Sequence, residues 1–397
     1  MNTPDEEPGN EIRRPILITC PRGNAEFLEA ELAALGFPPV SSGPAGVSIL
    51  GSLQDTQRLN LHLRTAHRVL FLVGSFRADT PERMYLEVTA VRWETLLPED
   101  GYVSVRSSVD NPSIRDTRFA NLKCKDAIVD RIRRRCGRRP DSGPGRSGAV
   151  VFLHWKHDRC SVYLDTSGES LSHRGYRKIP GDAPLRESTA AAVVLATGWS
   201  GDGAFLNPMC GSGTLAIEAA LVALGRAPGL LRSHFGFLHL KGFDRSRWDA
   251  ARREARKASR ASFPGRIVAT DIRREAVEAA QKNAATAGVA QHIEFRVCPY
   301  EETPVPEGGG VVVLNPAYGE RMGRAAELEA VYRGIGDFFK QRCQGYTGHV
   351  FTGNPALAKR IGLKTARRRV FFNASIECRL LSFDLYAGTR EARRSSE

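Results

Sequence analysis

Residues 315 to 318, Asn-Pro-Ala-Tyr, bring together an amide, a rigid backbone carbonyl and an aromatic ring directly after an apolar run. The oxygen of Asn315 and a neighbouring carbonyl can accept hydrogen bonds from an exocyclic amine, and the Tyr318 ring can stack on a base. The run, Gly310–Leu314, is rich in valine and predicts a buried α/β strand, and such sheets bind ligands at the carboxyl ends of their strands. Taken alone, the four residues fit a strand-to-loop turn equally well.

A second candidate is the segment Asn207–Thr214, NPMCGSGT, where closely spaced glycines join a predicted strand to a predicted helix. Such a turn lets a ligand approach the backbone and the helix N-terminus, although tight packing explains many glycine turns. It is not a P-loop, because the lysine of that motif is absent. Asp271 ends the next predicted strand, where an acid can accept hydrogen bonds from a ribose; a helix N-cap is the alternative. These features predict one sheet edge that could hold S-adenosylmethionine beside an amine.

The composition limits the class of protein. The chain has 397 residues, enough for two or three domains, and no apolar stretch approaches the roughly 20 residues of a membrane span. The polar N-terminal segment does not resemble a secretion signal. Eight scattered cysteines without a CxxC pair argue against a zinc ribbon and a disulfide framework, so we expect no metal site. A cytoplasmic location fits these features.

The net charge of +13 favours a polyanion as partner. Residues 113 to 146 hold eleven basic and four acidic side chains, a net charge of +7. A second basic cluster lies near the C-terminus, at Lys359, Arg360, Lys364, Arg367, Arg368 and Arg369. Solvated helix faces are the alternative, but neutralising phosphates accounts better for so much like charge. The first cluster supplies six candidate RNA contacts: Lys123, Lys125, Arg131, Arg134, Arg135 and Arg138.

The elements that must position these residues follow from periodicity. Up to residue 165 short strands alternate with helices, and we expect helices over 55–70, 84–96 and 119–135 and a hairpin over 150–164. Residues 165 to 184 are polar and rich in glycine, which indicates a linker. From Leu185 onward strands and helices alternate regularly, which predicts a parallel doubly wound sheet. Residues 226 to 262 interrupt this alternation with a loop and a charged helix over 248–259.

A resemblance supports this interpretation. The chain resembles the THUMP-domain RNA guanine-N2 methyltransferases, and among them the bacterial 23S ribosomal RNA enzymes, from about Pro15 to Tyr386. The strings that carry it are CPRG (20–23), LRTAHRVL (63–70), KDAIVDRIR (125–133), LDTSGESLSHRGYR (164–177), APLRESTAA (183–191), NPMCGSGTLAIEAA (207–220), NPAYGER (315–321), FTGN (351–354), IGLK (361–364) and IECRLLSFDLY (376–386).

The resemblance implies an α/β fold, in which a Rossmann-like seven-stranded methyltransferase domain is preceded by an α+β ferredoxin-like/THUMP RNA-binding region. The expected boundaries are a disordered lead-in (1–14), the ferredoxin-like region (15–65), the THUMP-like domain (66–165), a linker (166–184), the methyltransferase domain (185–390) and a disordered tail (391–397).

The resemblance also assigns roles to individual residues. Asn315, Pro316 and Tyr318 would hold the target guanine, whose exocyclic N2 receives the methyl group. S-adenosylmethionine would be held by Asn207, Cys210, Gly211, Gly213, Thr214 and Asp271. Structured RNA, most simply ribosomal RNA, would be the substrate.

Three residues depart from the family pattern, and all three fall in the expected pocket. The family usually has Asp at Asn207, an acid near Pro299 and a second proline at Ala317. Loss of the charge at residue 207 removes a partner for the cofactor's ammonium group, and charged hydrogen bonds contribute about 1.5 to 3 kcal/mol. An RNA-binding or ribosome-assembly protein with a weakened site therefore remains an alternative, as do a tRNA guanine-N2 and a DNA adenine-N6 methyltransferase.

Overall fold

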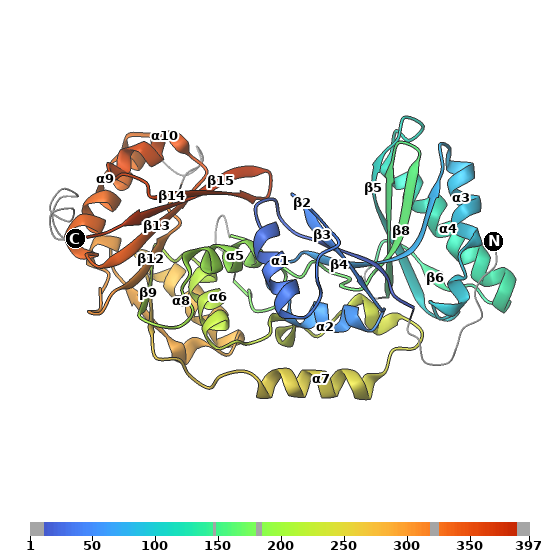
Figure 1. The fold of residues 1–397 in the computed structure, drawn as a ribbon, viewed down its shortest axis with the longest axis horizontal. Helices are drawn as coiled ribbons and strands as arrows, with labels where there is room; N and C mark the ends of the chain where they lie inside the picture. The colour runs from blue at the N-terminus through green and yellow to red at the C-terminus, as the bar shows by residue number, and fades with distance from the viewer. Residues whose placement is uncertain (1–11, 146–147, 180–184, 318–324, 387–397) are drawn as a thin grey trace. The chain divides into compact units, whose positions relative to one another are not determined.

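The computed structural model describes residues 12–145, 148–179, 185–317 and 325–386, which form two compact units (Figure 1). Unit 1 contains the chain up to Cys20, Leu28–Leu171 and Arg232–Glu254. Unit 2 contains Pro21–Phe27, Ser172–Leu231 and the chain from Ala255 onward. Segments of the two units therefore alternate along the sequence. No helix in the described part of the chain is long and apolar enough to cross a membrane.

Unit 1 is built on one eight-stranded sheet with the order β2-β3-β1-β4-β8-β7-β5-β6. Its first half has the order expected of a ferredoxin-like region: β1 (Arg14–Thr19), α1 (Ala25–Ala34), β2 (Ser41–Gly43), β3 (Gly46–Gly51), α2 (Asp55–His62) and β4 (Arg68–Arg77). Its second half contains α3 (Pro81–Ala90), β5 (Tyr102–Asp110), α4 (Thr117–Cys136), β6 (Asp141–Ser142), β7 (Ala149–Lys156) and β8 (Arg159–Asp165).

Strand β4 belongs to both halves of this sheet. Its first residues pair with β1, in a register that sets Leu17 opposite Leu70. Its remaining length pairs with β8 as far as Arg77, which lies opposite Arg159. The two halves of unit 1 consequently share a backbone hydrogen-bond ladder.

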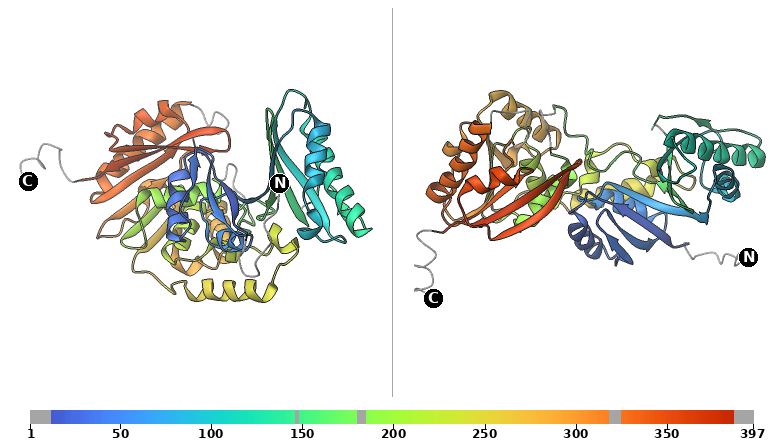
Figure 2. Two further views of the ribbon diagram at one scale, coloured as in Figure 1. Left: turned by 45° about the vertical axis from the view of Figure 1, so that its right-hand side comes forward. Right: turned by 90° about the horizontal axis from the view of Figure 1, so that it is seen from above.

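Helix α4 carries most of the basic segment of unit 1. Its N-terminus is capped by Asp116, whose side chain accepts a hydrogen bond from the Arg118 N–H at 2.8 Å, and Gly137 ends it in the left-handed conformation. Ala127, Ile128 and other apolar side chains are buried beneath the helix. α3 and α4 cover the same face of the sheet, as Figure 2 shows. The polar side of α4 is therefore left to solvent.

Unit 2 is built on a seven-stranded sheet with the order β11-β10-β9-β12-β13-β15-β14. Its elements are α5 (Glu187–Thr197), β9 (Ala204–Pro208), α6 (Thr214–Ala223), β10 (Arg266–Asp271), α8 (Arg274–Thr286), β11 (Ile293–Val297), β12 (Gly310–Leu314), α9 (Ala325–Arg342), β13 (Tyr346–Thr352), α10 (Pro355–Ala358), β14 (Arg367–Asn373) and β15 (Ile376–Asp384). The strands from β11 to β13 are parallel, as predicted. β15 is antiparallel to both its neighbours, so the prediction of a wholly parallel sheet was wrong.

Two apolar clusters cover the two faces of this sheet. One cluster contains side chains from α5, α6 and α8, and the other contains side chains from α9, α10 and the turn after it. The residues of β12 alternate between them, with Val313 in the first cluster and Leu314 in the second. The side chains of a strand buried on both faces are accessible to a ligand only at the ends of the strand. Ligands therefore reach this sheet at the carboxyl ends of its parallel strands.

Three sequence-based expectations need correction in detail. The helix expected over 55–70 ends at His62, because the chain then turns into β4. The helix expected over 84–96 ends at Ala90 and is followed by a short 3-10 turn at Trp93–Thr95. The charged helix expected over 248–259 is α7 (Arg245–Lys257), which begins earlier. Each difference concerns where an element begins or ends.

The segment predicted as a linker is largely a buried part of the fold. Arg174 and Tyr176 are 1% exposed, and both contact Glu218 on α6. The Arg174 guanidinium lies 3.3 Å from the Glu218 carboxylate, and the Tyr176 hydroxyl donates to it at 3.1 Å. Polar residues are excluded from a core only when they lack partners, and here the partner lies 44 residues away in the sequence. Residues 180–184 lie outside the described part.

Candidate active site

The glycine turn between β9 and α6 contains two glycines with different roles. Gly211 and Gly213 both have left-handed backbone angles, with φ of +54° and +83°. A Cβ atom on Gly213 would lie 2.8 Å from the Cβ of Ala280 on α8, so this glycine allows two helices to pack closely. A Cβ on Gly211 would meet nothing within 4 Å. Gly211 thus leaves open space where a ligand can approach the backbone.

Asp271 lies beside the same turn, at the carboxyl end of β10. One carboxylate oxygen accepts a hydrogen bond from the Gly211 N–H at 3.0 Å, and the other accepts from the Arg273 N–H at 3.0 Å. The residue is 7% exposed. An ionised carboxylate can accept about four hydrogen bonds, so acceptor capacity remains for the two hydroxyls of a ribose. The helix N-cap alternative and ligand binding are therefore compatible here.

Cys210 and Thr214, also predicted to contact the cofactor, have internal roles. The Cys210 N–H donates to the Thr270 carbonyl at 2.8 Å, which fixes the turn against β10. Burial, and then the nearby Asp271 carboxylate, raise the pKa of the Cys210 thiol, so it stays neutral. The Thr214 hydroxyl accepts a hydrogen bond from the Arg177 guanidinium at 3.2 Å. Both side chains shape the turn.

Arg177 and Asn283, which the sequence analysis did not predict as site residues, hold the glycine turn in place through hydrogen bonds. Arg177 also donates to the Glu187 carboxylate at 3.1 Å and to the Leu185 carbonyl at 2.7 Å. Asn283 on α8 donates to the Ser212 carbonyl at 3.1 Å and accepts from the backbone N–H of residue 178 at 2.9 Å. The available signal was the string HRGYR, which carried the resemblance but whose polarity suggested a linker.

Asn207 occupies the end of β9 and is 1% exposed. Its amide nitrogen donates to the Val313 carbonyl on β12 at 2.9 Å. Its side-chain oxygen is buried and has no hydrogen-bond partner within the described residues. A buried acceptor without a partner costs about 1 to 3 kcal/mol, and a cationic or N–H donor from a ligand would remove that cost.

Asn315 follows β12, the strand that pairs with β9, so it lies at the same edge as Asn207. Its side-chain oxygen is likewise buried without a partner in the part of the chain described. Pro316 is buried, and the carbonyl of Ala317 accepts a weak hydrogen bond from the Tyr332 hydroxyl at 3.4 Å. Tyr318 lies outside the described residues. Asn207 and Asn315 thus place two unpartnered oxygens at the ends of neighbouring strands.

The end of β11 lacks the acid expected from the family pattern. Pro299 precedes a short 3-10 turn, and the Cys298 N–H donates to the Asp271 backbone carbonyl at 3.1 Å. Glu301 and Glu302, the nearest acids in sequence, are exposed. Burial raises the pKa of the Cys298 thiol, so no anion is available from residues 298 to 300 to accept hydrogen bonds from an adenine amine.

The six predicted RNA contacts in unit 1 differ in their internal partners. Arg131 makes two hydrogen bonds to the Glu94 carboxylate, at 2.6 and 3.0 Å, and is largely covered, which gives it a structural role. Lys123 lies over the Tyr85 ring at 5.4 Å, and Lys125 pairs with its neighbour Asp126 at 3.2 Å. Of the six, Arg134, Arg135 and Arg138 are exposed and have no ion pair within the described ranges.

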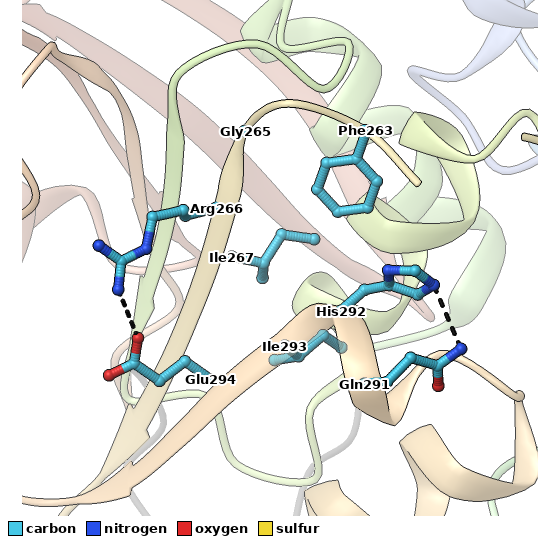
Figure 3. A pocket seen from close by; sticks show the side chains of 8 residues that line it. All are labelled: Phe263, Gly265, Arg266, Ile267, Gln291, His292, Ile293 and Glu294. Atoms are coloured by element: carbon cyan, nitrogen blue, oxygen red, sulfur yellow. Dashed lines mark hydrogen bonds and ion pairs between the residues drawn. The ribbon is translucent and has the colours of Figure 1, made fainter. Parts of the chain in front are cut away.

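A pocket of about 320 Å³ lies at the opposite edge of the unit 2 sheet, where β10 and β11 begin (Figure 3). It is lined by Phe263, Arg266, His292, Glu294 and their neighbours, and the Arg266 guanidinium pairs with the Glu294 carboxylate at 2.9 Å. Asp271 ends the strand that Arg266 begins. The pocket is therefore separated from the predicted cofactor site by the length of a strand.

The fold and this edge together define a class. A mixed seven-stranded sheet with a glycine turn after β9 and an acid after β10 identifies an S-adenosylmethionine-dependent methyltransferase domain. Residues 174–382 match the family model described as the RMKL-like methyltransferase domain. Residues 15–70 match the RlmL ferredoxin-like domain, and residues 78–165 match the THUMP domain. The chain belongs to the RMKL-like methyltransferase family, which confirms the predicted fold class and resemblance.

Individual relatives agree with this assignment. The chain is 40% identical over 380 residues to the ribosomal RNA large subunit methyltransferase K/L of Syntrophotalea carbinolica, covering 93% of this chain and 53% of that protein. It thus spans about half the length of the curated relatives of that name that it matches. It is also 33% identical over 383 residues to the putative RNA methyltransferase slr0064 of Synechocystis, covering 96% of this chain and all of that one.

One similar solved structure was determined with a cofactor product bound. SMU.472, a putative methyltransferase complexed with SAH, superimposes with a TM-score of 0.86 and 27% identity over 95% of this chain and 99% of that one. SAH, S-adenosylhomocysteine, is what S-adenosylmethionine becomes after losing its methyl group. This agrees with the prediction of S-adenosylmethionine as the cofactor.

Proposed function

We propose that this protein methylates RNA at the exocyclic N2 of a guanosine, in 23S ribosomal RNA. The observation that carries the proposal is the pair of buried, unpartnered oxygens of Asn207 and Asn315 at neighbouring strand ends. Most buried polar atoms in native structures have a hydrogen-bond partner, and two open acceptors on neighbouring strand ends fit a ligand with donor groups. The names of the relatives support the substrate class, since they describe a large-subunit ribosomal RNA methyltransferase and a putative RNA methyltransferase.

The residues at this edge fit the cofactor. Asp271 has acceptor capacity for a ribose, and Gly211 leaves the backbone accessible. The unpartnered oxygen of Asn207 can accept a hydrogen bond from the ammonium group of the methionine part. When bound, S-adenosylmethionine supplies an activated methyl group. The chain's own contribution is to hold that group and the acceptor in register.

The acceptor side consists of Asn315 and Pro316. The Asn315 oxygen and the Pro316 carbonyl can each accept a hydrogen bond from one N–H of a planar amine, which leaves the nitrogen lone pair, perpendicular to that plane, open toward the methyl group. Both oxygens also stabilise the positive charge that grows on the nitrogen as the N–CH3 bond forms and the S–CH3 bond breaks, until the nitrogen loses a proton to water. Tyr318 would replace the stacking partner of an unstacked base. No side chain at this edge needs to act as a strong base.

RNA binding would involve the exposed arginines of α4 and its C-terminal turn, namely Arg134, Arg135 and Arg138. They have no ion pairs within the described ranges, so their charge is available for phosphates. We exclude Arg131 from this set because Glu94 already binds it.

Methyl transfer from labelled S-adenosylmethionine to unmodified large-subunit ribosomal RNA tests the proposal, with transfer RNA and duplex DNA as competing substrates. We expect label in the N2 of a guanosine of the ribosomal RNA. Label confined to DNA would replace the proposal with adenine methylation, and label confined to transfer RNA would change the substrate.

A second candidate function is an RNA-binding or ribosome-assembly protein with a weakened methyltransferase site. Asn207 favours this second function. Its amide nitrogen donates to the Val313 carbonyl, but its neutral side-chain oxygen has no partner among the described residues and offers no charge to an ammonium group. Calorimetric titration with S-adenosylmethionine separates the two functions. Saturable binding below millimolar concentration supports the enzyme, and its absence supports the assembly protein.

A further inference from the structure

The segment Pro21–Phe27, which contains the PRG of the CPRG string, packs on β14 within unit 2. Gly23 has φ of +91°, and a Cβ atom there would lie 2.2 Å from the Val370 carbonyl oxygen. The Phe27 ring stacks on the Phe371 ring, with centroids 6.1 Å apart and planes inclined by 11°. These contacts leave the segment little freedom, so the backbone that carries the side chain directly before Gly23 is held against β14.

That side chain is Arg22, which is exposed. Its guanidinium carbon lies 5.8 Å from the centroid of the Phe372 ring, a cation–π arrangement. No ion pair of Arg22 occurs within the part of the chain that the structure describes. The ring covers one face of the guanidinium and leaves its N–H groups, which lie in the plane, available to an anion.

The register of the strands places this pair at the same sheet edge as Asn315. On β15, Arg379 lies opposite Thr352, the last residue of β13. β14 and β15 form a hairpin that extends beyond the end of β13, and Phe372 on β14 lies opposite Glu377 on β15. β14 is parallel to β13, since both are antiparallel to β15, so its carboxyl end lies at the ligand-binding edge (Figures 1 and 2).

The distance from the acceptor site is short. Two strands, β13 and β15, separate β12 from β14 in the sheet. Neighbouring strands lie about 4.8 Å apart, so β14, on which the segment with Arg22 packs, is displaced sideways from β12 by about 14 Å. This spacing suits a contact with nucleotides next to the one held at Asn315.

The charge around the hairpin favours a polyanion. Residues 355 to 384 contain seven basic and two acidic side chains, a net charge of +5. One of the two acids, Glu377, lies 3.2 Å from the Arg379 guanidinium in a pair exposed to solvent, which water and salt weaken. Four of the seven cations, Arg367, Arg368, Arg369 and Arg379, lie on the β14–β15 hairpin itself, and Arg369 is also paired with Glu26. Cations spread over several residues suit successive phosphates of a nucleic acid strand better than a single small anion.

We propose that the Arg22 guanidinium, oriented by the Phe372 ring, binds a backbone phosphate of the single-stranded RNA that flanks the target guanosine. The identity of the target rests on the proposed function. The contact with RNA itself rests on the geometry of the hairpin and its charge.

Arg22→Gln tests the proposal, with in vitro transcribed 23S ribosomal RNA as the probe. We expect equilibrium binding to weaken about five- to tenfold, and the slope of log affinity against log salt concentration to become shallower by about 0.7 to 1, because one phosphate contact is lost. Arg22→Lys should keep most of the salt slope. Affinity for S-adenosylmethionine should not change. In the methylation assay, the KM for RNA should rise while kcat stays constant.

Two further variants complete the test. Phe372→Leu keeps the charge of Arg22 but removes the ring, and should weaken RNA binding about two- to threefold. Arg266→Gln makes the same charge change at the opposite edge, beside the pocket of Figure 3, and should leave RNA binding unchanged.

Wild-type affinity and salt slope in Arg22→Gln would overturn the proposal. If Arg22→Gln does not fold, as judged by thermal melting, wild-type RNA binding by Phe372→Leu would overturn it instead. Absence of methyl transfer by the wild-type protein would contradict the proposed function, while the binding measurements would still decide the role of Arg22.

Discussion

Two regions at one sheet edge differ in their hydrogen bonding: the first is the end of β10, and the second is formed by the ends of β9 and β12. After β10, both carboxylate oxygens of Asp271 accept backbone hydrogen bonds, and the Cys210 N–H of the adjacent turn is paired. After β9 and β12, the side-chain oxygens of Asn207 and Asn315 are buried without partners among the described residues. The first region forms its hydrogen bonds within the chain, whereas the second leaves two acceptors open to a ligand. Substitutions should therefore affect the two regions differently.

The largest effect is expected for Asn315→Ala. Loss of the acceptor oxygen should lower kcat at least about a hundredfold, because this atom stabilises charge that develops during transfer. RNA affinity should remain nearly unchanged, since phosphates supply most of it. Rapid-quench methylation and filter binding measure the two quantities. Gln291→Ala, which removes an exposed amide near the opposite edge, is the control. Equal losses of kcat and RNA affinity would show that Asn315 has a structural role.

Asp271→Asn should affect the cofactor instead of the acceptor. The amide keeps one acceptor oxygen but loses the charge, and we expect the Kd for S-adenosylmethionine to rise about ten- to a hundredfold, or about 1.5 to 3 kcal/mol. Calorimetric titration measures it. Glu278→Gln, an exposed position on α8, makes the same charge change and should have no effect. Unchanged cofactor affinity in Asp271→Asn would mean that Asp271 only caps the turn.

Asn207→Asp tests the ends of β9 and β12 with a change that should strengthen cofactor binding. The carboxylate restores the acid usual in the family and should tighten cofactor binding about tenfold, since it can pair with an ammonium group. The free protein should become less stable, because the introduced carboxylate would be buried and the donor to the Val313 carbonyl would be lost. Titration and thermal melting with and without cofactor measure both effects. A variant with equal cofactor affinity would refute the proposed role of residue 207.

Tyr332→Phe should have the smallest effect. The Tyr332 hydroxyl shares a hydrogen bond of 2.7 Å with the Thr352 hydroxyl and donates weakly to the Ala317 carbonyl. Its loss should lower kcat about threefold and stability by about 1 kcal/mol. Tyr346→Phe removes a hydroxyl that donates to the Pro306 carbonyl, at the amino end of β13, and should lower stability alone. Equal kcat values for both variants would show that Tyr332 does not position residues 315 to 317.

The sequence predicted most elements of the fold because apolar periodicity reflects burial directly. Apolar patterns predicted β12 and the helices on either side of the sheet, and glycines marked the turns. The antiparallel pairing of β14 with β15 follows from the two residues that join them, because parallel strands need a much longer connection. That β15, and not β14, pairs with β13 could not be predicted, because the local pattern of a strand does not specify its neighbour. The buried segment around Arg174 was missed for a similar reason, since its partner Glu218 is distant in sequence.

The candidate site was predictable in part. Glycine conformation, strand ends and acceptor chemistry are local properties, so the motifs could point to Gly211, Asp271 and Asn315, whose binding roles stay predictions. The motifs did not distinguish the packing role of Gly213 from the open position of Gly211, which depends on Ala280 of another helix. Nor could charge alone show that Arg131 is bound by Glu94, whereas Arg134 remains exposed.

Strand β4 also determines how this protein can be divided. The matched ferredoxin-like and THUMP regions end at residue 70 and begin at residue 78, so a cut between them would sever or remove β4. A fragment that begins at residue 78 would present the bare edge of β8, and unpaired edges promote aggregation. A fragment that ends at residue 70 would lose most of the strand that closes its own sheet. The ferredoxin-like and THUMP regions, which match separate family models, thus share strand β4. Genetic exchange between relatives should therefore preserve the two regions together.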